Sequence, residues 1–149
     1  MHKKGQAAME FLMTYGWALL VVLAAIAALA YFGVLSPDSY LPEKCTLPSG
    51  IPCLDFTAPS TSEVNLVIQN SAGFDISSVT ASVDELGSCT VNSTTGNDNN
   101  LTNGEKATLY CSGSDVGSGK FKSVINLNYT NEDTGLDHNK EGELIIKMP

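Results

Sequence analysis

The chain contains no arginine. All eight of its basic side chains are lysine, and sixteen aspartate and glutamate side chains outnumber them. Proteins that bind nucleic acid need a basic surface to pair with the phosphate backbone. A formal net charge of −8 at pH 7 therefore argues against a nucleic-acid partner and suits a surface that faces solvent.

The sequence also lacks the motifs that mark catalytic proteins. It contains no G-x-S-x-G, H-E-x-x-H, C-x-x-C or G-x-G-x-x-G pattern. Residues 117–120 resemble a phosphate-binding loop, but the leading glycine is missing and Phe121 occupies the place of the magnesium-binding hydroxyl. His138 is the single histidine after residue 5, and it lies in an acidic stretch. We therefore expect neither an enzyme nor a cofactor.

An asparagine-rich run at residues 97–100 has the oxygen donors of a calcium loop. Such a loop needs glycine at its sixth position and a bidentate glutamate at its twelfth. Counted from Asp98, the glycine is missing at the sixth position and Leu109 stands at the twelfth. The sequence therefore predicts no metal site.

Charge is absent altogether between Phe11 and Pro37. This run is about twice as long as the 7–15 apolar residues of a secretory signal peptide. It also exceeds the roughly 20 residues that a membrane-spanning helix requires. Its alanine, leucine and methionine content favours a helix. We predict one helix over residues 6–36, about 45 Å long at 1.5 Å per residue, which ends before Pro37.

A short basic segment precedes this apolar run. Lys3, Lys4 and Gly5 are followed by Gln6, and a single acid, Glu10, stands just before the uncharged residues. An ordinary membrane anchor does not explain this glutamate. Residues 6–12, QAAMEFL, fit the pattern Q-x-x-x-E-x-L. The arrangement resembles the N-terminus of archaeal type IV adhesion pilins, whose precursors carry a class III signal peptide.

The resemblance implies that a prepilin peptidase removes residues 1–5 by cutting between Gly5 and Gln6. The helix would remain in the mature subunit, and many copies would polymerise through it into an extracellular adhesion filament. Other implied partners are an assembly ATPase and a membrane platform. Before assembly, the leader lysines would hold the start of the chain in the cytoplasm and leave the remainder outside. Their removal would take the net charge from −8 to about −10.

Glu10 has two interpretations. The resemblance implies a role in assembly, in which Glu10 pairs with the amino group of Gln6 in its own or a neighbouring subunit and sets the axial register. Alternatively, Glu10 is a membrane-interface acid near a helix N-terminus, where negative charge is tolerated.

Related surface proteins remain as alternatives to an adhesion pilin. A minor pilin or a pseudopilin of an envelope machine would share the same leader. Archaellins share the cut site but usually lack the continuation seen at residues 8–12. A plain membrane-anchored binding domain would have no reason to be cut between Gly5 and Gln6.

Four cysteines, Cys45, Cys53, Cys89 and Cys111, lie beyond the apolar run. An even number in an exported domain indicates disulfides, and three connectivities are possible. We favour Cys45–Cys53, which closes a short loop, together with Cys89–Cys111 between two predicted strands. Zinc is the alternative, but no pair has the spacing of two to four residues that structural zinc sites favour.

Three N-x-S/T sequons, at Asn92, Asn100 and Asn128, are glycosylation candidates. Modification would suit a domain on the cell surface. The alternative is coincidence, because this part of the chain is rich in asparagine, serine and threonine.

The remaining sequence predicts a β-domain. Residues 37–62 hold five of the six prolines and are predicted to form a stalk. From residue 63 onward, apolar and polar residues alternate as in half-buried strands. Together with the helix, this gives an α+β chain with a small immunoglobulin-like antiparallel β-sandwich at 63–149. Strands are predicted at 63–69, 76–83, 89–92, 107–111, 121–129 and 143–148, with a core of Val64, Leu66, Ile68, Val79, Val83, Leu109, Ile125, Leu127 and Ile145.

Overall fold

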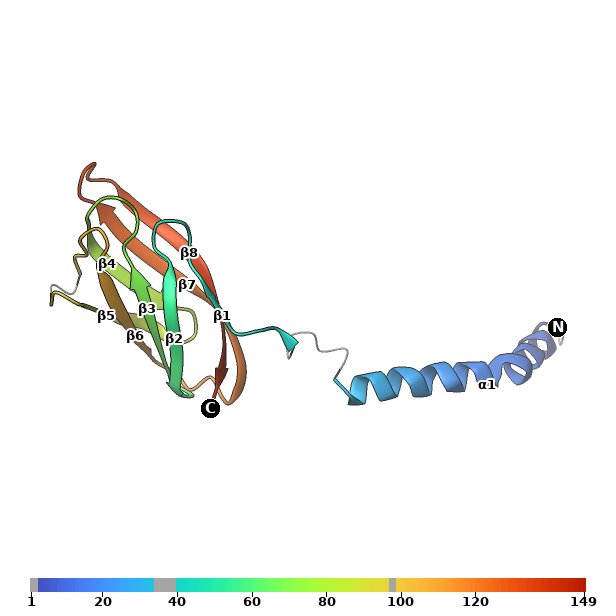
Figure 1. Cartoon of the computed structure of the whole chain (residues 1–149). Helices are drawn as coiled ribbons and strands as arrows, with labels where there is room; N and C mark the ends of the chain where they lie inside the picture. The colour runs from blue at the N-terminus through green and yellow to red at the C-terminus, as the bar shows by residue number, and fades with distance from the viewer. Residues whose placement is uncertain (1–2, 34–39, 97–98) are drawn as a thin grey trace. The chain divides into compact units, whose positions relative to one another are not determined.

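The computed structural model describes residues 3–33, 40–96 and 99–149 (Figure 1). The chain divides into two compact units, Met1–Leu41 and Pro42–Pro149. The described residues of the first unit contain one long helix, and the second unit is a β-domain. The α+β class predicted from the sequence is confirmed, and each unit is described by itself.

Helix α1 spans Lys3–Tyr31. It begins three residues before the predicted start, so the cut predicted between Gly5 and Gln6 falls inside helical backbone. At its other end, Gly33 adopts a left-handed φ of 71°, and its N–H donates to the carbonyl of Ala30. Glycine ends helices in this way because it lacks the Cβ that disfavours the left-handed conformation. The predicted residues 34–36 lie outside the described part of the chain.

The β-domain consists of eight strands in one antiparallel sheet. The six predicted strands are present, most of them with extended ends, and two more precede them. In chain order the strands are β1 (Lys44–Thr46), β2 (Cys53–Ser60), β3 (Glu63–Gln69), β4 (Ile76–Val83), β5 (Gly87–Ser93), β6 (Lys106–Ser112), β7 (Gly119–Asn131) and β8 (Asp137–Met148).

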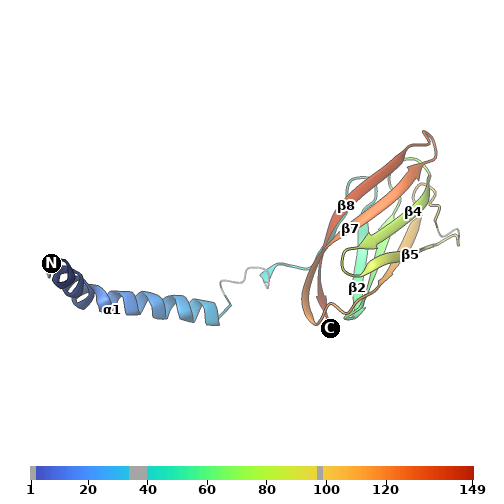
Figure 2. The same cartoon turned by 180° about the vertical axis from the view of Figure 1, so that it is seen from behind.

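The sheet curls into a sandwich that approaches a closed barrel (Figures 1 and 2). Its strand order is β1-β8-β7-β4-β5-β6-β3-β2. The two strands at the ends of this order, β1 and β2, are consecutive in the chain and lie next to each other where the sheet comes around. The sheet therefore has a seam between its first and last strands.

The prediction of a proline-rich stalk over residues 37–62 was wrong for its second part, because β1 and β2 lie within it. Strand β2 carries Pro59 and an irregular register against β3, so the apolar-polar alternation that reveals a strand is broken. An end strand tolerates both features, because it has a neighbour on one side only. Strand β1 is three residues long and too short to give a pattern.

The core lies between the two layers of the curled sheet. All nine predicted core residues are buried, eight of them in one interior cluster. Ile145 is the exception, because alternation along β8 places it on the opposite face from Leu144 and Ile146. Its neighbours in the register are Lys44 and Lys122, both of which form ion pairs with Glu143. The outer face of β8 therefore buries an isoleucine beneath paired charges.

Loops close one end of the core with side chains that the strand pattern did not predict. Ile51 from the β1–β2 loop and Leu101 from the β5–β6 loop are both buried. Leu101 forms a two-way backbone bridge with Ile76 at the start of β4. At the other end, Gly113 packs directly against the backbone of Leu86, which leaves no room for a side chain.

We expect Gly113→Ala to destabilise the β-domain by about 3 kcal/mol, because a Cβ at this position would overlap the backbone carbonyl of Leu86. Thermal or denaturant unfolding of the purified protein would measure the loss. The control is Ser114→Ala at the next, exposed position, which should change stability by less than about 0.5 kcal/mol. Equal stability of the two variants would contradict the close packing of Gly113.

Candidate assembly site and the disulfide seam

Helix α1 presents its apolar side chains to its surroundings, and none of its residues is buried within the chain. Large side chains such as Leu20 (69% exposed) and Trp17 (69% exposed) stand free. Leaving a large apolar side chain in water costs about 1.5–3 kcal/mol of free energy relative to burying it. Such a helix therefore requires an apolar environment. Its length and composition suffice for crossing a membrane.

The predicted processing and assembly residues lie together at the start of this helix. Gly5 has no atom within 4 Å of the place where a Cβ would be. Gln6 and Glu10 are four positions apart, which places them on the same side of the helix one turn from each other. The backbone carbonyl of Glu10 also accepts a hydrogen bond of 2.8 Å from the Thr14 hydroxyl.

Aromatic rings follow Glu10 along the helix. The Phe11 and Tyr15 rings lie 4.9 Å apart between centroids, on the helix face that also carries Ala18. Together with Leu19 and Val22 they border a shallow apolar hollow of about 270 Å³. A small residue between larger ones leaves this kind of space, which allows close approach of another apolar helix.

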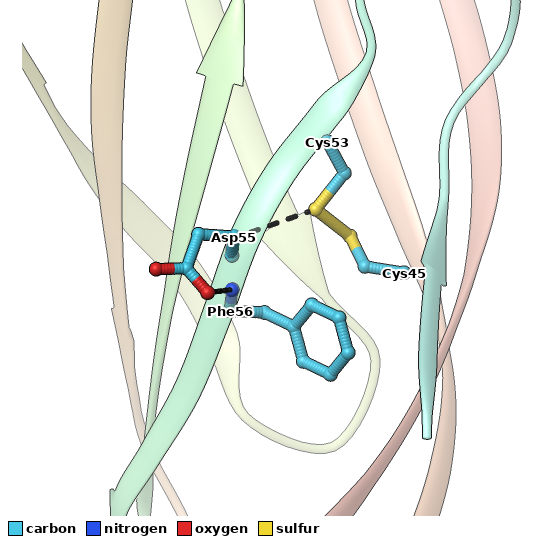
Figure 3. The surroundings of a disulfide bond; sticks show 4 residues. All are labelled: Cys45, Cys53, Asp55 and Phe56. Atoms are coloured by element: carbon cyan, nitrogen blue, oxygen red, sulfur yellow. Dashed lines mark hydrogen bonds between the residues drawn. A yellow bond between two sulfur atoms is a disulfide. The ribbon is translucent and has the colours of Figure 1, made fainter. Parts of the chain in front are cut away.

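The β-domain contains the two disulfides that the sequence analysis favoured, Cys45–Cys53 and Cys89–Cys111. Cys45 lies in β1 and Cys53 begins β2, and their Cα atoms are 5.9 Å apart. Figure 3 shows the bond crossing from one end strand of the sheet to the other. The disulfide therefore joins the sheet to itself across the seam.

The second disulfide has a different setting. Cys89 and Cys111 are directly opposite each other in the register of β5 and β6, and their Cα atoms are 4.0 Å apart. Both side chains point toward the interior, where Cys111 is buried. This bond reinforces a pairing that the hydrogen-bonded ladder already makes.

The three sequon asparagines are all exposed. Asn92 lies in β5, Asn128 in β7, and Asn100 in the loop between β5 and β6. The side-chain oxygen of Asn100 accepts a hydrogen bond of 3.3 Å from the N–H of Ser78, a residue with a φ of 52°. Asn100 therefore also braces the bulge in β4.

Glu105 is a site residue that the sequence analysis missed. The residue is 8% exposed, and its carboxylate accepts hydrogen bonds from the N–H and hydroxyl groups of both Thr95 and Thr102. These contacts tie both ends of the β5–β6 connection to one side chain. Burial alone would raise the pKa of Glu105, but the hydrogen bonds from Thr95 and Thr102 outweigh it and lower the pKa to about 2.

A sequence signal for Glu105 was available. Residues 102–105 read T-x-x-E, the spacing at which a glutamate reaches back to the N–H of a threonine three residues earlier. That contact is present here at 2.9 Å. The same spacing is common in helix caps, and without the fold nothing indicated that a loop would use it.

Two other polar features of the sequence are His138 and the asparagine-rich run at residues 97–100. His138 stacks on Tyr129 with ring centroids 5.2 Å apart. Within residues 3–33, 40–96 and 99–149, no group of three histidine, cysteine, aspartate or glutamate side chains is arranged to hold a metal ion. Two residues of the calcium-loop candidate, 97 and 98, lie outside the described part of the chain.

No family model and no curated protein matches the chain. Among solved structures, the crystal structure of the yeast GGA1 GAE domain is similar at 19% sequence identity and a TM-score of 0.42. The match covers 72% of this chain and 100% of that domain. At this level the likeness says nothing about function. An N-terminal apolar helix followed by an antiparallel β-domain is compatible with a pilin.

We expect the double substitution Cys45→Ser/Cys53→Ser to cost about 2–3 kcal/mol of stability, as is typical for a short disulfide loop. It should also open the seam selectively, so that the amides of β1 and β2 exchange hydrogen faster than those of β7. The matched control is Cys89→Ser/Cys111→Ser, which removes the disulfide that closes the longer loop. This variant should lower global stability without a selective effect on hydrogen exchange in β1 and β2. If β1 keeps its full protection without Cys45–Cys53, the seam does not depend on the bond.

Glu105 should make the β-domain acid-sensitive. Its folded-state pKa of about 2 lies below the ordinary value of 4.5, so its contribution is complete above about pH 5 and is lost as the pH falls toward 2. Glu105→Gln should therefore cost about 1–3 kcal/mol at pH 7 and flatten the stability profile between pH 5 and 2. Glu63→Gln, at an exposed position on β3, is the control. A Glu105→Gln profile parallel to that of the wild type would contradict the assignment.

Proposed function

We propose that this chain is a structural subunit of an archaeal type IV-like pilus. It would polymerise through its N-terminal helix into an extracellular adhesion filament. The observation that carries the proposal is α1, a 29-residue apolar helix with no buried residue, headed by the sequence K-K-G-Q-A-A-M-E-F. The independently formed β-domain supplies the part of the subunit that faces water.

The energetics of α1 fit a subunit that moves from a bilayer into a fibre. Lipid and the interior of a helix bundle are about equally apolar, so burial in either environment satisfies the exposed side chains. Transfer between them gains little, and assembly therefore requires work from an ATPase acting through a membrane platform. Departure from the fibre into water would expose more than a dozen large apolar side chains at about 1.5–3 kcal/mol each. The filament would hardly dissociate.

Processing would act within the first turn of α1, between its third and fourth residues. The peptidase has to cut between Gly5 and Gln6, and proteases require an extended substrate, so the helix has to unwind there first. Glycine is among the weakest helix formers, at about 1 kcal/mol relative to alanine, and Gly5 eases this unwinding. The cut removes Lys3 and Lys4 and leaves a charged amino group on Gln6, one helical turn from Glu10.

The disulfides and the exposed sequons support an external location for the β-domain. Disulfides persist in oxidising surroundings and are rare in the cytoplasm of most organisms. The proposal gives the chain no catalytic role and no cofactor. Its partners are further copies of itself, the prepilin peptidase and the assembly machinery.

Shearing of intact source cells should release the protein in a filament fraction whose N-terminal peptide begins at Gln6. Mass spectrometry of the sheared material measures this directly. A protein that retains Met1 and stays with the membranes would be an anchored surface domain, and the pilus assignment would fall.

Glu10→Gln should lower the yield of sheared filaments while leaving the cut before Gln6 intact, because the variant keeps the side-chain shape but loses the charge that pairs with the new amino group. The yield is measured against the total mature protein in the same cells. Thr14→Ser, one turn further along and with its hydroxyl retained, is the control. A normal yield of filaments from Glu10→Gln would contradict the assembly role and favour the interpretation of Glu10 as a membrane-interface acid.

A further inference from the structure

The outer face of β1, β8 and β7 carries a cluster of lysines in an otherwise acidic chain. Lys120 and Lys147 are directly opposite each other in the β7–β8 register. Lys44 and Lys122 flank Ile145 on its two sides. All four lysines are exposed, and we call them the lysine cluster.

The charges within this cluster are only partly compensated. Glu143 pairs with Lys44 and, at 3.2 Å, with Lys122, and hydrogen bonds from these two ammonium groups lower the pKa of Glu143. No other ion pairs occur within the described residues. Lys120 and Lys147 face each other as like charges across neighbouring strands, an arrangement that costs stability. The Glu43 carboxylate lies beside this pair and accepts a hydrogen bond of 2.8 Å from the backbone N–H of Lys147, so the four lysines are set against two glutamates. An anionic partner would relieve the repulsion between Lys120 and Lys147.

Acidic side chains gather at the other end of the same hairpin. Glu132 and Asp133 lie in the turn after β7, and Asp137 begins β8. The N–H of Glu132 donates to the carbonyl of Asp75 at 3.0 Å, which brings the β3–β4 loop beside this turn. These four residues are exposed, and we call them the acidic end.

The two clusters are too far apart to neutralise each other within one domain. Figure 2 shows β7 and β8 side by side, with the C-terminus at one end of the hairpin and the connecting turn at the other. Strand β7 has 13 residues and is therefore about 40 Å long. The Debye length at physiological ionic strength is about 8 Å, so each cluster presents an unbalanced potential at its own end.

We propose that the lysine cluster of one subunit contacts the acidic end of another copy of this chain. The inference rests on the proposed function and adds a specific contact between β-domains. A contact between two different patches is heterologous, and when the rotation between copies does not close a ring it generates an open helical filament. Complementary potentials of this kind fix the orientation and register of partners. This local attraction would offset the electrostatic repulsion between subunits that each carry a net negative charge.

Charge reversal with rescue tests the contact in cells that produce one form of the full chain. Lys120→Glu/Lys147→Glu should lower the share of mature protein in the sheared filament fraction several-fold, and Glu132→Lys/Asp133→Lys should do the same. All four substitutions together should restore it, because the pairing is then inverted. The restored variant also shows that each change is compatible with folding. As a matched single control, Lys106→Glu on β6 should assemble normally where Lys120→Glu does not.

The outcomes separate this inference from the proposed function. If wild-type protein that begins at Gln6 is never found in a sheared fraction, the proposed pilus function is contradicted. Wild-type filaments together with doubles that assemble normally, or a fourfold variant as poor as the doubles, would overturn the contact alone. If only the lysine reversal lowers assembly, the lysines meet a different anion, such as an acidic lipid surface, and the contact between copies is overturned.

Discussion

The β-domain depends on the closure of its sheet at the seam between β1 and β2. A three-residue strand such as β1 gains little from its pairing with β8, and within the described part of the chain β2 is hydrogen-bonded as a strand to β3 alone. The Cys45–Cys53 bond holds these two end strands together and so makes an open sheet behave as a near-barrel. A core of this size in a small domain gains a large part of its net stability from such a crosslink. The same bond covers sheet edges that would otherwise offer unpaired backbone groups to other chains.

The open part of the edge is protected by charge. Among residues 3–33, 40–96 and 99–149, no strand pairs with the first half of β8 on its β1 side, because β1 covers only Glu143 to Ile145. His138 and Lys140 belong to the inward-facing set of this strand, and Asp137, Asn139 and Glu141 to the outward-facing set, as alternation requires. Polar and inward-pointing charged residues at an edge discourage the addition of a foreign strand.

Two opposed demands on solvation divide the chain into its two units. Helix α1 is stable only where its side chains find an apolar environment, in a bilayer or among other helices. The β-domain buries its own apolar residues and exposes charge. In the proposed pilus subunit, this separation would allow the helix to change its surroundings while the β-domain stays folded. Glu105 contributes to the stability of the β-domain, because its buried carboxylate holds Thr95 and Thr102, near the two ends of the β5–β6 connection.

Features that depend on local composition could be predicted without the fold. The absence of charge from residue 11 to residue 37 specified α1, and period-two alternation specified β3, β4 and β6 almost to the residue, because a half-buried strand must alternate. The favoured cysteine pairs also followed from spacing and predicted strands. The strands β1 and β2 could be recognised only from the folded arrangement, since end strands need no regular pattern. It also placed Ile145 on the outer face under paired charges and brought Thr95, Thr102 and Glu105 together. These outcomes depend on which distant segments become neighbours, and local sequence carries no record of that.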